Sequence, residues 1–335
     1  MKKIFFLFAA MTALSFASCK KQEAIQPDVV VPVEKATISV NLTGLTAYAT
    51  KTTTIDHEST PTNVQLFVFR NLSTDKTQNI LDVKATNAGL SFDVTATSGD
   101  KVFYALVNSP ALSVTTESDF LAHVSNLDEN AVATSFVMIG TQTQAIASGA
   151  NTVQINVDRI CSRIKIDKIT NSLSAPYSVL KIQDIYVSNV AGDVNLATAL
   201  SPSTAYAVSQ WYNAAAYSSK ASVDGLLYDN TIASDLANST STTGTHYLYA
   251  YPNMQTGANV TRLVVTAKID NDATVYYYPI TLPEAVTPNK SFNISDIIIT
   301  RPGSINPNQP VELGTCNVQI TVNPWADVTL PNPTI

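Results

Sequence analysis

The chain has 335 residues, of which 45% are hydrophobic and 14% charged, and its formal net charge is −6. A chain of this length can build one large core or two domains of common size, and we expect two. The acidic balance and the lack of a basic stripe exclude nucleic-acid binding as an expected function. Thr, Val, Ile and Tyr are spread along the chain, so we predict a mainly β protein.

Residues 1–18 have the three parts of a secretory signal peptide: two lysines, an apolar run from Ile4 to Phe16, and small residues before Cys19. The junction FASC resembles a bacterial lipobox, in which Cys19 is diacylated and becomes the first mature residue. The alternative is an ordinary signal peptide followed by an incidental cysteine. The apolar run is too short to span a bilayer as a helix, and the polar residues 19–35 suit an extended tether.

Residues 36–51, with the sequence ATISVNLTGLTAYATK, predict a first strand that can be detached. Ile38, Val40 and Leu42 fall on one face, which is the period of a half-buried strand. Lys51 is the first basic residue after this pattern, in a threonine-rich loop. A trypsin-like cut there would release the strand and leave an open groove whose edges invite a strand from another chain.

The rest of the predicted N-terminal domain, residues 36–158, is also rich in strands. Residues 64–69 are apolar on both faces, which indicates a strand covered on both sides, and residues 101–107 have the same character. The pattern predicts one short helix, over 117–127, after threonines that can cap it. Residues 152–157 return to alternation and close this domain.

The predicted C-terminal domain covers residues 159–335 and begins with the strand pattern RICSRIKIDKI. The alternation changes phase within 179–187, so we expect a β-bulge near Gln183 and Asp184. Residues 191–245 have few aliphatic runs and are predicted to form a long connection. Strand patterns then recur at 246–251, 262–269, 274–280 and 293–300.

The last strand pattern, NVQITVNPW, follows a proline- and asparagine-rich linker over 301–310. Val318, Ile320 and Val322 alternate as the first strand does, with Trp325 as a terminal anchor, so residues 317–335 are a candidate donor strand. The alternative is that this strand pairs permanently within its own domain.

The sequence offers little chemistry for catalysis. The three histidines are isolated, and we find no zinc spacing, phosphate-binding loop or nucleophile elbow, so we expect no catalytic residue, metal or cofactor. Cys161 and Cys316 are candidates for a disulfide, with buried thiols as the alternative. Two tyrosine clusters, at 247–251 and 276–278, are either strand packing, which we favour, or a stacking platform for sugars.

Taken together, these motifs resemble the fimbrillin family of the Bacteroidota, the major fimbrial subunits. The likeness runs from end to end: the lipobox cysteine Cys19, the ATISV opening, DRICSRIKIDKI at the domain crossing, YYP at 277–279, NISDIIIT before the linker, and the terminal NVQITVNPW. It implies two tandem transthyretin-like β-sandwiches, export as an outer-membrane lipoprotein, removal of the first strand and polymerisation by strand donation. The chain departs from the family at Lys51, where members processed by Arg-specific proteases carry arginine.

The expected function is therefore that of a structural subunit of the fimbrial stalk. Its partners would be further copies of itself and accessory fimbrial subunits, with a lipid anchor to the outer membrane before processing. The alternative is a monomeric surface lipoprotein that binds glycans or host proteins, which would need neither a severable first strand nor a mobile last one.

Overall fold

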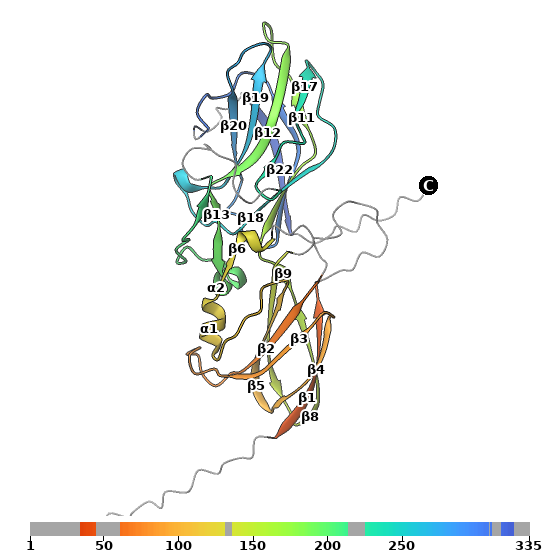
Figure 1. The fold of residues 1–335 in the computed structure, drawn as a ribbon, viewed down its shortest axis with the longest axis vertical. Coiled ribbons are helices and arrows are strands. Elements are labelled where there is room, and N and C mark those ends of the chain that lie inside the picture. The colour runs from red at the N-terminus through yellow and green to blue at the C-terminus, as the bar shows by residue number, and fades with distance from the viewer. Residues whose placement is uncertain are drawn as a thin grey trace, which may run out of the picture. The chain divides into compact units, whose positions relative to one another are not determined.

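The computed structural model describes residues 34–44, 61–130, 136–213, 225–307, 309 and 316–324. Strands make up most of these residues and the helices are short, so the predicted mainly β class is confirmed (Figure 1). No helix within these ranges is both long enough and apolar enough to cross a bilayer.

Two sheets in the N-terminal part share a hydrophobic core, as in a β-sandwich. The smaller sheet has the order β4 (Ser91–Thr97), β1 (Lys35–Thr43), β8 (Gly149–Asn156). The larger has the order β3 (Leu81–Asn87), β2 (Val64–Arg70), β5 (Gly99–Val107), β7 (Met138–Ile146), β9 (Asp158–Arg159). Apolar side chains from both sheets form one buried cluster between them.

Strand β2 is covered on both faces, as its continuous apolar sequence predicts. Val64, Leu66 and Val68 belong to the core shared with the smaller sheet. Phe67 and Phe69 point to the other face and belong to a second buried cluster. That side of the strand therefore needs its own cover, which comes in part from a helix.

The helix is α1 (Glu117–Ala122), and Phe120 packs its ring 5.0 Å from the ring of Phe67. Thr116 caps it through a reciprocal pair of hydrogen bonds with Asp119. The predicted extension to residue 127 is wrong. After the helix the backbone instead forms β6 (Val124–Asn126), which pairs with β14 (Asp193–Asn195), and then the 3₁₀ turn η2 (Leu127–Asn130).

The C-terminal part contains two further sheets around the second cluster. In one, the central strand is β21 (Lys290–Ile299), which pairs in parallel with β10 (Ser162–Ile166) and β11 (Ile169–Asn171) and antiparallel with β22 (Cys316–Pro324). Strand β18 (His246–Ala250) extends this sheet by pairing with β10. In the other, β12 (Val179–Ser188) pairs with β16 (Tyr228–Asp229), β17 (Ser234–Ala237) and β19 (Arg262–Ile269), and β19 pairs with β20 (Tyr276–Thr281).

The predicted bulge in β12 is confirmed. Its register against β19 shifts between Ile182 and Asp184, so Gln183 has no direct partner in that ladder. One extra residue turns the side chains that follow onto the opposite face. This explains why Leu180 and Ile182 alternate in one phase and Ile185 and Val187 in the other.

The prediction of a single helix is corrected by α2 (Leu196–Leu200), which lies beside α1 (Figure 1). The side chain of Asn195 caps it by accepting a hydrogen bond from the Thr198 amide, 2.9 Å away. The helix has five residues, too few for a helical period to stand out in the sequence. The same region also contains short strands, β13 (Val190–Ala191) and β15 (Trp211–Tyr212), where we had expected only a connection.

The chain passes from the first group of sheets to the second between Arg159 and Ser162. Side chains link the groups: Asn289 donates to the Asp158 carboxylate at 2.7 Å, and the Tyr251 hydroxyl lies 2.8 Å from that of Ser125. The second buried cluster contains residues of both groups. The division into domains at 158–159 stays a prediction.

Candidate functional site

The first strand, β1, lies between two partners in the smaller sheet. It pairs antiparallel with β4 from Lys35 to Asn41 and parallel with β8 from Ala36 to Thr43. The three strands are far apart in the sequence. In the sheet, β1 lies between β4 and β8, which do not pair with each other. Without β1, both neighbours would expose unpaired backbone N–H and C=O groups.

The side chains of β1 alternate between core and solvent. Ile38 and Val40 are 0% exposed and Leu42 is 6% exposed, whereas Thr37 and Asn41 face solvent. Burial of three such side chains stabilises the fold by about 5–8 kcal/mol before ordering costs. The strand is therefore a large contributor to the N-terminal core.

A continuous apolar surface lies beneath β1. The buried cluster that includes Ile38, Val40 and Leu42 draws most of its other members from β2, β4, β5, β7 and β8, among them Leu66, Val68, Phe92, Phe103, Ala105 and Ile155. A void there would forfeit the dispersion contacts and leave these side chains to water. The groove under β1 thus needs an apolar strand to fill it.

The chain leaves the sheet at Gly44, which has a φ of +84°. A side chain there would be strained, and a Cβ would stand 2.6 Å from the carbonyl oxygen of Val157. The amide of Val157 in turn donates to the carbonyl of Thr43 at 3.0 Å. The end of β1 is therefore fixed just before the segment that carries Lys51, which lies outside the described residues.

A buried ion pair holds the β4 side of the groove. The ammonium group of Lys101, 1% exposed, lies 2.8 Å from the carboxylate of Asp82, which is 6% exposed. The same carboxylate accepts hydrogen bonds from the amide and hydroxyl of Thr97, at 2.9 and 2.6 Å. Thr97 is the β4 residue opposite Lys35 of β1, so this network joins β3, β5 and β4 where β1 begins.

Burial by itself would raise the pKa of the Asp82 carboxyl. The hydrogen bonds from Lys101 and Thr97 and the charge of Lys101 outweigh that effect, and the pKa lies below its ordinary value. The carboxylate is therefore charged in the folded protein at neutral pH.

The last strand pattern forms β22, which pairs antiparallel with β21 of the same chain. Residues 318, 320 and 322 stand opposite Ile297, Ile294 and Phe292, and Ile320 packs against the second cluster while its neighbours Gln319 and Thr321 are exposed. Among the described strands β22 pairs with β21 alone, at one edge of the sheet. The structure therefore shows the intradomain pairing that the sequence left as the alternative to donation.

The candidate disulfide between Cys161 and Cys316 is corrected by the strand register. Cys161 is buried and its carbonyl accepts a hydrogen bond from the Asn289 amide, just before β21 begins. Cys316 pairs with Ile299 at the far end of β21. Ten residues of strand separate these positions by about 33 Å, whereas disulfide-bonded Cα atoms lie about 4–7 Å apart.

The tyrosine clusters contribute mainly to packing. Tyr249, Tyr251 and Tyr278 are buried, which confirms the strand-packing interpretation for these three residues. The hydroxyl of Tyr251 accepts a hydrogen bond from the Asn130 amide at 2.7 Å. Tyr247 is half-buried, with the guanidinium of Arg163 5.7 Å from the centre of its ring.

Several predicted site residues lie outside the described residues: Cys19, Lys51 and Trp325. For Val318 and Val322 the structure gives only the backbone register. Within the described ranges, no group of three or more His, Cys, Asp or Glu side chains is arranged to hold a metal ion.

Fold and site together define a mainly β protein in which a terminal strand is inserted between two others over an apolar groove. No known family profile and no curated protein sequence matches the chain. Solved structures do match, at low sequence identity but over most of their length.

One of these structures, described as a cell adhesion protein from Bacteroides eggerthii, has a TM-score of 0.62 at 16% identity and covers 88% of this chain and 97% of its own. A fimbrilin from Porphyromonas gingivalis has a TM-score of 0.60 at 17% identity, with 87% and 97% covered. A tip fimbrial protein of that organism has a TM-score of 0.54 at 12% identity, with 87% and 100% covered. The chain therefore has the fold of the fimbrillins, as the sequence resemblance predicts.

Proposed function

We propose that this chain is a structural subunit of a fimbrial stalk, exported as an outer-membrane lipoprotein precursor and polymerised by strand donation. The observation that carries the proposal is the position of β1, hydrogen-bonded on both sides and buried along one face. The fold shared with fimbrial and cell adhesion proteins supports a fimbrial subunit at the cell surface, and it gives no support to an enzyme.

The proposed sequence of events begins with Cys19, whose lipid anchors the precursor. Two acyl chains give firm membrane binding where one gives only marginal binding. Cleavage after Lys51 then separates β1 from the rest of the chain. Once β1 leaves, the edges of β4 and β8 and the apolar groove between them become an acceptor for another strand.

The donor in this proposal is the segment 317–335 of another copy. Val318, Ile320 and Val322 have the same spacing as Ile38, Val40 and Leu42, so they can enter the same pockets, with Trp325 as a terminal anchor. A slip of one residue would turn Gln319 and Thr321 into the apolar groove, so the register is specified. Donation requires β22 to leave β21, and among the described strands that is the one ladder that has to open.

The test is to identify, by mass spectrometry, the N-terminal residue of the subunits on the surface of the producing bacterium. Wild type is compared with the variants Lys51→Ala and Lys35→Ala. Processing after Lys51 predicts mature subunits that begin at Thr52. Lys51→Ala should yield membrane-anchored monomers that retain residues 36–50, because the groove stays filled and the lipid at Cys19 is not cut off. Lys35→Ala is the matched control and should polymerise normally, since a cut at Lys35 would leave β1 in place.

Polymers that retain residues 36–50 would contradict the proposal, because strand removal would then not trigger assembly. Wild-type protein that stays monomeric with an intact first strand would favour the alternative of a monomeric surface lipoprotein.

A further inference from the structure

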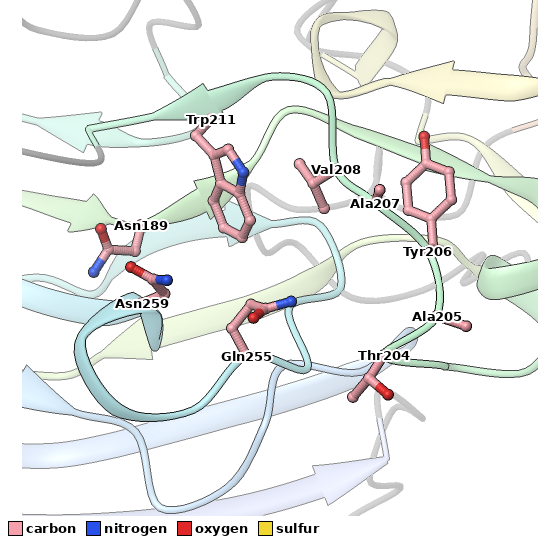
Figure 2. Close-up of a pocket in the computed structure, with 9 residues that line it drawn as sticks. All are labelled: Asn189, Thr204, Ala205, Tyr206, Ala207, Val208, Trp211, Gln255 and Asn259. Atoms are coloured by element: carbon pink, nitrogen blue, oxygen red, sulfur yellow. The ribbon is translucent and has the colours of Figure 1, made fainter.

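A pocket of about 470 Å³ lies in the C-terminal part, away from β1 and β22 in the sequence. One wall is the segment from Thr204 to Val208 together with Trp211 of β15, and the other is the loop that contains Gln255 and Asn259 (Figure 2). That loop includes the 3₁₀ turn η3 (Gly257–Asn259) and leads into β19. None of its lining residues belongs to β1 or β22.

The apolar part of the pocket is centred on Trp211. Its half-buried indole packs on one side against the second hydrophobic cluster, as Val208 does, and it extends into the space between the two walls (Figure 2). An aromatic face of this kind attracts weakly positive C–H groups, which cover the faces of a pyranose ring. The pocket therefore has a rigid stacking surface.

The polar part of the pocket consists of carboxamides. The side chains of Gln255 and Asn259 lie across from Trp211, one half-buried and one exposed (Figure 2). Each carboxamide carries two N–H donors and a carbonyl acceptor, so it can bond to hydroxyl groups in both directions. No hydrogen bond within the described part of the chain engages either side-chain amide, so both are available to a ligand.

A buried asparagine holds this polar wall in place. The side-chain amide nitrogen of Asn253 lies 2.9 Å from the carbonyl oxygen of Asn259 and 3.0 Å from that of Asn189. Its side-chain oxygen accepts a hydrogen bond from the backbone N–H of Gln255 at 2.9 Å. Asn189 adds hydrogen bonds to the carbonyls of Ala258 and Val260, both 3.0 Å. A wall fixed in this way does not have to be ordered when a ligand binds.

A buried carboxylate holds the opposite wall. Asp193 accepts hydrogen bonds from the Tyr206 hydroxyl at 2.8 Å, the Ser209 hydroxyl at 2.6 Å and the Gln210 amide at 3.1 Å. These bonds fix the segment that carries Tyr206 and Val208 to the first residue of β14. Both walls are therefore shaped before any ligand arrives.

The lining residues carry no formal charge at neutral pH. A charged ligand would find no counter-ion there, and the chain as a whole is acidic. A stacking indole, carboxamides and rigid walls together fit a flat, neutral, hydroxyl-rich ring. We propose that this pocket binds a neutral pyranose ring of a glycan.

The test uses the unprocessed chain with Trp325→Phe, which leaves Trp211 as the single tryptophan and its fluorescence as the signal. The probes are methyl β-galactopyranoside, methyl α-mannopyranoside and N-acetylglucosamine, with N-acetylneuraminic acid as the charged sugar and N-acetyl-phenylalanine amide as the peptide-like ligand. At least one neutral sugar should give saturable binding, with a Kd of about 1–10 mM for a single ring.

Gln255→Ala should weaken that binding about fivefold to tenfold without a change in melting temperature, because it removes only hydrogen bonds to the ligand. Trp211→Ala should abolish the saturation-transfer NMR signal of the sugar. Tyr177→Ala, which removes an exposed aromatic ring outside the pocket lining, is the matched control and should bind like the parent.

Three results would overturn the proposal: no saturable binding of any neutral sugar, equal affinity in parent and Gln255→Ala, or tighter binding of the charged sugar or the capped amino acid. None of these results depends on whether the first strand is removed, so the experiment tests the sugar-binding proposal independently of the polymerisation proposal.

Discussion

Asp82 and Lys101 show how a buried charge can support an apolar site. Each is almost completely enclosed, and two opposite charges in such a place are stable only when their geometry and hydrogen bonds replace the lost water. Thr97 supplies those further hydrogen bonds. Since Thr97 also belongs to the strand that borders β1, the network fixes one wall of the groove.

We predict that Asp82→Asn lowers the free energy of unfolding by about 3–5 kcal/mol near neutral pH, because it leaves the buried charge of Lys101 without the carboxylate that neutralises it. Asp100→Asn, at an exposed position next to Lys101 on β5, is the matched control and should change the free energy of unfolding by less than about 0.5 kcal/mol. Urea unfolding of the unprocessed chain measures both.

The pH dependence of this difference follows from the lowered pKa of Asp82. A carboxyl whose folded pKa lies below its unfolded value contributes stability that is present above the unfolded pKa and is lost as the pH falls through the folded one. The difference in free energy of unfolding between wild type and Asp82→Asn should therefore be constant from about pH 5 to 7 and should shrink below about pH 4. A gap that stays constant down to about pH 2 would contradict the assignment.

At the scale of the element, β1 and β22 have similar alternation and opposite surroundings. β1 is hydrogen-bonded on both sides, whereas among the described strands β22 pairs with β21 alone. Among the described strands one ladder, to β21, holds β22, so its exchange opens fewer backbone hydrogen bonds than that of a central strand. This difference is why donation can be proposed for one strand and proteolytic removal for the other.

Ile320→Asp and Gln319→Asp form a matched pair that tests the donor strand. In processed protein, Ile320→Asp should abolish ladders that resist mild SDS, because it would bury a charge in the groove. Gln319→Asp should polymerise like wild type, because its side chain is exposed in β22 and would face outward in the predicted register. Equal polymer in both variants would rule out this register, and unfolding of Ile320→Asp would show that β22 is needed within its own sheet.

At the scale of the whole molecule, the proposed strand removal would exchange stability for the capacity to assemble. A subunit processed in this way would lose the burial of Ile38, Val40 and Leu42, together with two ladders of backbone hydrogen bonds. A donor strand from another copy can restore both. Polymerisation in this scheme replaces an intramolecular strand with an intermolecular one and needs no new fold.

Hydrogen exchange can detect that replacement. Amides of β4 and β8 that pair with β1 should be protected in the precursor, should exchange about 100-fold faster or more in processed monomers, and should regain protection in the polymer. Amides of β19, which lies in the other group of sheets, are the internal control and should not change. Protection of β4 and β8 that is unchanged in processed monomers would mean that the groove closes on itself.

By itself, the sequence determined several of the longer strands and which of their side chains turn inward. The alternation of Ile38, Val40 and Leu42, the two apolar faces of residues 64–69 and the phase change near Gln183 are local patterns, and all three appear in the structure. The five-residue helix α2 was missed because it is shorter than two helical turns.

Only the tertiary structure decided which strands meet. Period-two alternation specifies a face but not a neighbour, so nothing in residues 36–51 indicates that β1 lies between β4 and β8. For the same reason the sequence could not separate Cys161 from Cys316, which the register places at opposite ends of β21. The pocket around Trp211 combines residues from Asn189 to Asn259 through long-range hydrogen bonds, and such an arrangement leaves no motif in the chain.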